Sequence, residues 1–269
     1  MIIKRRYWIL LEITLTASDG YTENISLPEF DLRGIACNPE NGSELGIENT
    51  TITITHTATS KTVDQTIHVS AVAVDADNNE YLIEKIGEQL WIIENLRTTK
   101  FSNGDDIATT DPFGLDISLE TSPVYQWSFF GDEGSVDPHG RLYTWYAVTD
   151  NRNVCPTGWH VPSDDEWTEL TDFLGGTEVA AGKMKEEGTS NWSDPNVGAT
   201  NESGFTAIPG GGRINDGTYY NQHEAAIYWT STQYSETEAY LRDLANVYII
   251  VTREKTHKGF GFSVRCLRD

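Results

Sequence analysis

Residues 153–170, NVCPTGWHVPSDDEWTEL, carry the clearest local folding signal in the chain. Ser163 is followed three residues later by Glu166, which is the capping-box pattern that begins an α-helix. Two glycines at 175–176 then supply a typical helix end. The sequence therefore predicts a helix over about 163–174. The apolar residues expected to share its buried face are Trp167, Leu170 and Phe173.

The same stretch allows three interpretations: a nucleophile, a metal site or a structural corner. A nucleophilic Cys155 needs a base such as His160 within hydrogen-bond reach and a third group that orients the base. The ligand types of a metal site are present in His160, Asp164 and Asp165. However, acids at the start of a helix already interact favourably with the helix dipole, and Pro156 with the glycine turn after it indicates a strand-to-helix corner. We interpret the stretch as scaffold without catalytic residues, and the metal site stays open as an alternative.

The tryptophans of the chain are expected to form its core. Trp159 and Trp167 fit a buried apolar cluster, in which Trp145 or Trp229 is the expected packing partner. A second helix is predicted from about 178 to 187, before Gly188. Its apolar residues are Val179 and Met184.

The N-terminal part of the chain is dominated by strand patterns. Its β-branched, alternating segments are 7–16, 51–59 and 65–74. Glu12 interrupts the first of these, so we interpret it as a strand and not as an export signal. The acidic segment 75–80, DADNNE, is interpreted as a polar turn, because it lacks the glycine and terminal glutamate of a calcium loop. We therefore expect a small immunoglobulin-like β-sandwich at 1–76 and a second domain at 80–269.

The overall composition limits the classes of partner. The 269 residues include 41 acidic and 19 basic side chains, and the formal net charge of −22 repels nucleic-acid phosphates and anionic membrane surfaces. No apolar stretch reaches the roughly 20 residues that a membrane span needs. Nucleic-acid binding and membrane insertion are therefore not expected.

Six segments of the second domain occur in an order that resembles the Fibrobacter succinogenes major paralogous domain, which is abundant in gut Bacteroidetes and their phages. The segments are GEQLWIIENLRTTKFSNGDDI (87–107), GRLYTWYAV (140–148), CPTGWHVPSDDEWTEL (155–170), NESGFTAIPGGGR (201–213), YWTSTQ (228–233) and GFSVRCLRD (261–269). The resemblance covers essentially all of 80–269. It implies an α+β fold similar to C-type lectin-like domains, with two helices beside small antiparallel sheets. It also implies a disulfide between Cys155 and Cys266, which would leave Cys37 unpaired.

We expect no cofactor. Many C-type lectins bind sugar through calcium at an E-P-N or Q-P-D loop followed by W-N-D. Here NWSDPN (191–196) has Asp194, Pro195 and Asn196 but no W-N-D after it, so calcium is left as an open alternative. The related formylglycine-generating enzymes need an active-site cysteine pair, whereas the two cysteines of this domain are expected to be structural. We therefore expect no enzyme activity.

The expected function is non-catalytic surface recognition by a phage virion component, a head-fibre or tail-tip protein on the virion surface that binds a bacterial surface glycan or protein. The alternatives are a secreted or cell-surface adhesin of a gut Bacteroidetes bacterium, and an enzyme of the formylglycine-generating type. The N-terminal domain is the expected attachment point for a second copy or another virion protein. We expect the ligand-binding residues between Arg213 and Lys258, because tyrosine and arginine are enriched at recognition surfaces. The predicted set is Tyr219, Tyr220, Tyr234, Tyr240, Arg242 and Tyr248.

Overall fold

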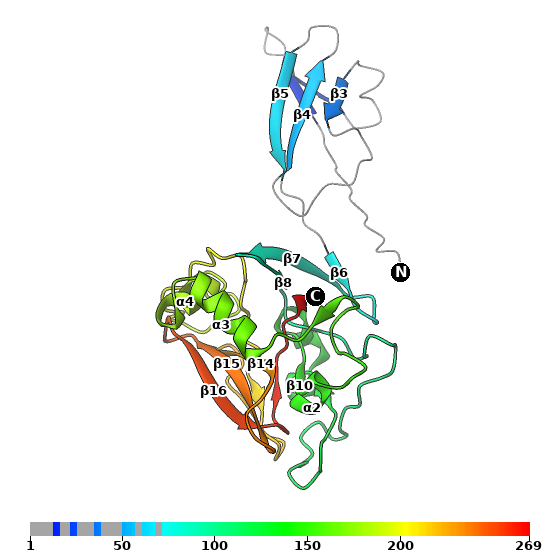
Figure 1. Ribbon diagram of the computed structural model, residues 1–269, viewed down its shortest axis with the longest axis vertical. Coiled ribbons are helices and arrows are strands. Elements are labelled where there is room, and N and C mark those ends of the chain that lie inside the picture. The colour runs from blue at the N-terminus through cyan, green and yellow to red at the C-terminus, as the bar shows by residue number, and fades with distance from the viewer. Residues whose placement is uncertain (1–12, 17–21, 26–34, 39–49, 57–60, 68–71) are drawn as a thin grey trace. The chain divides into compact units, whose positions relative to one another are not determined.

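The structure is a computed structural model of the chain, and it describes residues 13–16, 22–25, 35–38, 50–56, 61–67 and 72–269. The chain divides into two compact units, Met1–Ala71 and Val72–Asp269 (Figure 1). Each unit is considered by itself below.

The described residues of the first unit all lie in strands. These are β1 (Ile13–Thr16), β2 (Thr22–Ile25), β3 (Ile35–Asn38), β4 (Thr50–His56) and β5 (Lys61–Ile67). β1 pairs with β2, and β4 lies between β3 and β5, in two antiparallel sheets. Strands were predicted at 7–16 and 51–59, and the described parts of both are strands. The segment predicted as one strand at 65–74 instead contributes to two, β5 and the later strand β6.

The second unit contains strands from both of its ends and from its middle. They are β6 (Val72–Val74), β7 (Glu80–Ile86), β8 (Gln89–Ile92), β9 (Gln126–Trp127), β10 (Leu142–Thr144), β11 (Trp159–His160), β12 (Gly212–Arg213), β13 (Tyr219–Tyr220), β14 (Ala225–Gln233), β15 (Glu238–Ala245), β16 (Val251–His257), β17 (Gly261–Phe262) and β18 (Leu267–Arg268). Its helical segments are the 3-10 turns η3 (Phe129–Gly131) and η4 (Glu133–Ser135) and the helices α1 (Val136–His139), α2 (Trp145–Val148), α3 (Asp164–Phe173) and α4 (Thr177–Met184). The unit is mostly β with a few helices, which agrees with the α+β class.

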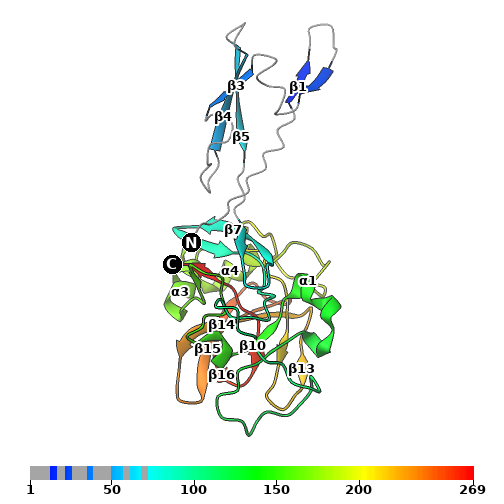
Figure 2. The same cartoon turned by 90° about the vertical axis from the view of Figure 1, so that its right-hand side faces the viewer.

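Three sheets bring distant parts of the second unit together. One has the order β13-β12-β17-β10-β9, and a second has the order β11-β18-β8-β7-β6. In the second sheet the last strand, β18, lies between β11 and β8, so the C-terminal end of the chain is beside β8 (Figure 1). The third sheet is the antiparallel β14-β15-β16, and α3 and α4 lie beside it (Figures 1 and 2).

The polar segment 75–80 lies inside the second unit. β6 pairs with β7, and residues 75–79 form the turn between them. The Asp75 carboxylate accepts hydrogen bonds from the backbone N–H groups of Asp77 and Asn79 and from the Tyr81 hydroxyl. This carboxylate therefore closes the turn. The division into domains at 1–76 and 80–269 stays a prediction, and the compact units meet a few residues earlier.

The predicted helices are present, and their packing differs in one respect. The Ser163 side chain accepts from the Glu166 N–H and the Glu166 side chain accepts from the Ser163 N–H, so the capping box is complete. Trp167 and Leu170 are buried, as predicted, but Phe173 is 63% exposed. At 100° per residue, Phe173 lies about 120° around the helix from Trp167, which takes it off the buried face. Its ring lies against Gly87 instead.

The core is built from aromatic rings, but with other pairings than expected. Trp159 and Trp167 are buried, and so is Trp229. The ring of Trp167 lies 5.0 Å from Trp91 and 5.5 Å from Tyr228, between ring centres. The expected partners Trp145 and Trp229 are engaged elsewhere: the indole N–H of Trp145 donates to the backbone of β14, and that of Trp229 donates to the backbone of β10.

Candidate functional site

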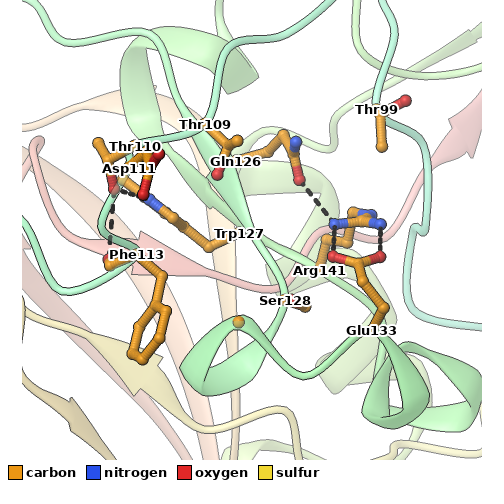
Figure 3. A pocket seen from close by; sticks show the side chains of 11 residues that line it. Thr99, Thr109, Thr110, Asp111, Phe113, Gln126, Trp127, Ser128, Glu133 and Arg141 are labelled. Carbon is orange, nitrogen blue, oxygen red and sulfur yellow. Dashed lines mark hydrogen bonds and ion pairs between the residues drawn. The ribbon is translucent and has the colours of Figure 1, made fainter.

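Two adjoining cavities are lined by residues that lie between Asp77 and Arg141 in the sequence, before β10 begins. The first has a volume of about 420 Å³ and the second about 550 Å³. Thr99, Glu133 and Arg141 line both, so the two cavities are compartments of one groove. We call the first the aromatic compartment, lined by Thr99, Thr109, Thr110, Asp111, Phe113, Gln126, Trp127, Ser128, Gly131, Glu133 and Arg141 (Figure 3). We call the second the acidic compartment, lined by Asp77, Asn79, Glu80, Arg97, Thr99, Glu133, Val136, Asp137 and Arg141.

The floor of the aromatic compartment is fixed by Trp127. This residue is on β9, where it pairs with Leu142 of β10, and its side chain is buried. Its indole N–H donates to the Thr110 hydroxyl at 2.9 Å, and the Arg213 guanidinium lies 4.1 Å from its ring centre. A buried indole whose N–H and ring face are both engaged is a rigid element. Trp127 therefore positions the loop that contains Thr110.

The loop around Phe113 is held from beneath by Arg213 and Tyr219. Arg213 is fully buried, and its guanidinium donates to the carbonyl oxygens of Phe113 and Leu115 at 3.1 and 2.6 Å. The Tyr219 hydroxyl also donates to the Phe113 carbonyl, at 3.2 Å. These bonds anchor the backbone of the loop, so the Phe113 ring is presented at the surface.

Two exposed phenylalanine rings lie here: Phe113 lines the compartment, and Phe130 packs against Phe113 and precedes the lining residue Gly131. Phe113 is 43% exposed and Phe130 is 54% exposed. Phe130 has a φ of 51°, a left-handed conformation that is unfavourable for a bulky side chain. Its ring lies 4.8 Å from Tyr219 and 6.4 Å from Phe113, between ring centres. Backbone strain that presents an apolar ring to solvent is typical of binding sites.

A buried arginine separates the two compartments. The Arg141 side chain is 10% exposed, and its guanidinium makes a two-point ion pair with Glu133, whose side chain is 66% exposed (Figure 3). Arg141 also donates to the Gln126 side-chain oxygen and to the Arg97 carbonyl, each at 3.0 Å. The hydrogen bond from Arg141 lowers the pKa of Glu133. The pair is therefore a fixed partition between the two compartments.

The acidic compartment carries more carboxylates than its cations neutralise. Arg97 is paired with Glu94 at 2.6 Å, and Asp77 is paired with Lys100 at 3.2 Å. The Arg97 guanidinium also donates to the Glu80 carbonyl and interacts with the Asp137 charge. Glu80 and Asp137 are exposed, and among the described residues neither carboxylate has an ion pair of its own. The same holds for Asp111 in the aromatic compartment.

Two of the predicted ligand residues are buried. Arg242 is 1% exposed, and its guanidinium bonds the Asp164 carboxylate at 2.8 Å and the Thr168 hydroxyl at 2.9 Å. Its side chain is therefore part of the support of α3, and the expectation that it lies on an exposed surface is wrong. Tyr219 is 6% exposed, and it stands beneath the two phenylalanines described above. It is the one member of the predicted set that belongs to the surroundings of the groove.

Tyr240 is on β15, and Tyr234 follows the end of β14 and lies next to it. Their ring centres are 5.4 Å apart. The Lys255 ammonium lies 3.6 Å from the Tyr234 ring centre, and the Arg253 guanidinium lies 4.0 Å from that of Tyr240. A cation thus covers one face of each ring.

The remaining two predicted residues are apart from the groove linings. Tyr248 is 60% exposed in the β15–β16 connection, where its carbonyl accepts from the buried Lys185 ammonium at 2.8 Å. Tyr220 is half-buried on β13, and burial raises its pKa to about 12. The ligand roles of Tyr220, Tyr234, Tyr240 and Tyr248 stay predictions.

The opening stretch 153–170 is structural where the structure describes its contacts. Cys155 and Cys266 form a disulfide with their Cα atoms 6.0 Å apart, as predicted. The ring nitrogens of His160 are hydrogen-bonded to Asp269 and Glu166 at 2.7 and 3.0 Å. The Asp164 carboxylate accepts hydrogen bonds from Arg242 at 2.8 Å and from Arg253 at 2.7 Å. Asp164 and Glu166 are thus engaged within the fold, whereas Asp165 is exposed.

The described residues include no group of three or more His, Cys, Asp or Glu side chains placed to hold a metal ion. None of their helices is long and apolar enough to cross a membrane.

The segment considered for calcium is held by hydrogen bonds of Asn196. Its side-chain amide donates to the carbonyl oxygens of Glu186 and Gly188 at 2.9 and 2.6 Å.

The sequence interpretation missed the residues that form the groove. A signal was present in WSFFGDEG (127–134), where three aromatic residues, glycines and two acids occur without helical or strand periodicity. Such a stretch is typical of a functional loop.

Comparison with known proteins identifies the second unit. The family model of the Fibrobacter succinogenes major domain matches residues 85–268. No curated protein and no solved structure matches the chain. The matched segment spans more than half of the 269 residues and contains the disulfide, α3, α4 and most of the groove. The chain belongs to the Fibrobacter succinogenes major domain family.

Proposed function

We propose that the chain is a non-catalytic recognition protein whose second unit binds a bacterial surface glycan in the groove. The exposed rings of Phe113 and Phe130, beside a compartment lined by hydroxyl, amide and carboxylate groups, are the observation that carries this proposal. Aromatic faces pack on the apolar faces of sugar rings, and a few convergent polar groups then fix the orientation of a ligand. The ion pair between Glu133 and Arg141 holds both side chains in place, which supports a preformed binding surface.

We further propose a C-type lectin-like fold for the second unit and an immunoglobulin-like fold for the first. The first assignment is supported by α3 and α4 beside small antiparallel sheets and by the bond from Cys155, before α3, to Cys266, next to the last strand. The second is supported by the antiparallel pairing of the described strands β1 to β5.

The setting proposed for this binding is the surface of a phage virion, as a head-fibre or tail-tip component. The family is abundant in gut Bacteroidetes and in their phages. The alternative setting is therefore the surface of a bacterium, where the chain would act as an adhesin. In both, the partner is a bacterial surface glycan or protein. The net charge of −22 is compatible with both, because neither requires contact with nucleic acid.

A glycan array probed with the full chain tests the proposal. We expect binding to at least one glycan, and we expect Phe130→Ala to weaken that binding about 30-fold, since central aromatic contacts contribute about 2 kcal/mol or more. Phe173→Ala is the matched control, because Phe173 is also an exposed phenylalanine but lies on α3 outside the groove linings. It should bind as the unaltered chain does.

Tyr240→Ala and Tyr248→Ala separate this proposal from the surface predicted between Arg213 and Lys258. Loss of binding in these variants, with normal binding in Phe130→Ala, would move the site to the region of β15 and its connection to β16. Absence of any bound glycan would contradict glycan recognition by this chain.

A further inference from the structure

Two histidines from distant parts of the chain lie together, and neither of them lines the groove. His139 is the last residue of α1, and His223 lies in the turn that precedes β14. Their ring centres are 4.7 Å apart, and the two ring planes meet at 87°. His139 is 7% exposed, whereas His223 is exposed. The pair therefore has one buried member and one member that solvent reaches.

Backbone carbonyl groups determine the tautomer of both rings. The Nδ1 atom of His139 lies 2.9 Å from the Pro209 carbonyl oxygen, and the Nδ1 atom of His223 lies 2.9 Å from the Asn191 carbonyl oxygen. A carbonyl oxygen only accepts, so each Nδ1 carries the proton and donates it. Each neutral ring therefore has its lone pair on Nε2, and the described residues provide no hydrogen bond to either Nε2.

Metal-binding histidines are held in the same way. Such a residue donates its second ring N–H to a backbone carbonyl or a carboxylate, which fixes the ring and leaves the other nitrogen for the ion. Burial lowers the pKa of His139, and the His223 charge lowers it as well, while the bond to Pro209 opposes both. The neutral imidazole that a metal ion requires is thus favoured at neutral pH.

The separation of the rings matches a shared ion. Nε2 lies about 2.0–2.1 Å from a bound ion of the zinc class, so two imidazoles on one ion have ring centres about 4.5–5.2 Å apart for angles between square and tetrahedral. The observed 4.7 Å falls in this interval. Because the described residues supply no group of three metal-ligating side chains, water would complete the coordination.

The backbone that presents His223 is also constrained. Its φ is 71°, a left-handed conformation that is uncommon for a residue with a side chain. Its carbonyl oxygen accepts from the Ser193 N–H at 2.6 Å, which ties the turn to the same segment that holds its ring through Asn191. Strained conformations that the surrounding structure maintains are concentrated at functional sites.

We propose that His139 and His223 bind one divalent transition-metal ion of the zinc, nickel or copper class through their Nε2 atoms. Imidazole suits these ions, whereas carboxylate and water suit Mg²⁺ and Ca²⁺. The bound ion links α1 to the turn before β14. This site is independent of the proposed glycan binding.

The test titrates Ni²⁺ into the full chain by calorimetry near neutral pH, with excess Mg²⁺ present throughout. A chain of net charge −22 offers many carboxylates, and Mg²⁺ occupies these without competing for imidazole nitrogen. We expect a Ni²⁺ site that persists in Mg²⁺. His223→Gln should weaken it about tenfold or more, because loss of a group that merely orients a metal ligand already costs about 10–100-fold.

His257→Gln is the matched control. The Nδ1 atom of His257 accepts from the Gly259 N–H at 3.1 Å, so this ring has the opposite tautomer and its Nε2 carries the proton. The control should bind Ni²⁺ as the unaltered chain does. Because His223 is exposed, His223→Gln should fold normally, and circular dichroism checks the fold of the more buried His139→Gln.

Electron paramagnetic resonance of the Cu²⁺-loaded chain provides a second readout, which a purely structural role of the histidines would not change. We expect nitrogen coupling from two imidazoles in the unaltered chain and from one in His139→Gln or His223→Gln. Three results would overturn the proposal: unchanged Ni²⁺ affinity in His223→Gln, complete suppression of Ni²⁺ binding by Mg²⁺, or coupling from a single imidazole in the unaltered chain. Each of them would leave the two rings as a packing contact only.

Discussion

Replacement of Arg242 by alanine should destabilise the second unit far more than replacement of Arg253, although both arginines bind the same carboxylate. Arg242 is 1% exposed, and its guanidinium lies 2.8 Å from an Asp164 oxygen. The side chain of Arg253 is 47% exposed, and it lies 2.7 Å from the other oxygen. The two variants remove one charge each from one ion triad, so burial is the main difference between them.

The expected magnitudes follow from that difference. Burial lowers the pKa of Arg242, and the Asp164 charge opposes this effect, so the arginine remains a buried cation that needs its partner. Arg242→Ala strips the carboxylate of its buried partner, and the Thr168 hydroxyl and the Asp164 carbonyl lose a donor. Breaking a buried pair in this way costs about 3–5 kcal/mol, whereas the exposed Arg253 contributes about 1 kcal/mol or less.

Urea unfolding followed by tryptophan fluorescence measures both effects. Seven of the eight tryptophans lie in the second unit, so the signal reports this unit. The loss in Arg242→Ala should also lower its melting temperature by roughly 6–20 °C. The reasoning is refuted if Arg242→Ala loses less than about 1 kcal/mol, or if the two variants unfold at the same urea concentration.

Two more predictions concern stability. Removal of the disulfide by Cys155→Ala with Cys266→Ala should lower the free energy of unfolding by about 5 kcal/mol in the chain-entropy view, because the bond joins residues 111 positions apart; an unfolding midpoint that does not respond to reductant would contradict this. The half-buried Asp243 has one buried oxygen without a hydrogen-bond partner among the described residues, and burial together with the Glu254 charge raises its pKa to about 6. Since an unfolded aspartate titrates near 3.9, the native state holds the extra proton, and this stabilising contribution is lost as the pH rises from about 4 through 6. Asp243→Asn should flatten the stability profile across that window, and an unchanged profile in equilibrium unfolding at several pH values would show that another group is responsible.

Local signals in the sequence determined the helices and the pattern of the strands. The capping box at Ser163 and Glu166 and the glycines after Phe173 act within a few residues of each other, so they specify α3 before any tertiary contact forms. Alternation of β-branched residues similarly predicted β4. The disulfide between Cys155 and Cys266 came from family resemblance, because nothing local links two residues so far apart in the chain.

Tertiary structure alone decided which polar and aromatic side chains are buried and which are presented. Arg242 follows Leu241 on the central strand of its sheet, and its burial depends on Asp164, which lies far away in the sequence and arrives with α3. Phe113 reaches the surface because Arg213 and Tyr219 hold its backbone, and Arg141 divides the groove because Glu133 reaches it from a separate turn. The free energy of a charge or a ring depends on its neighbours in space. A single sequence shows the residue types, but it does not show which of them become neighbours.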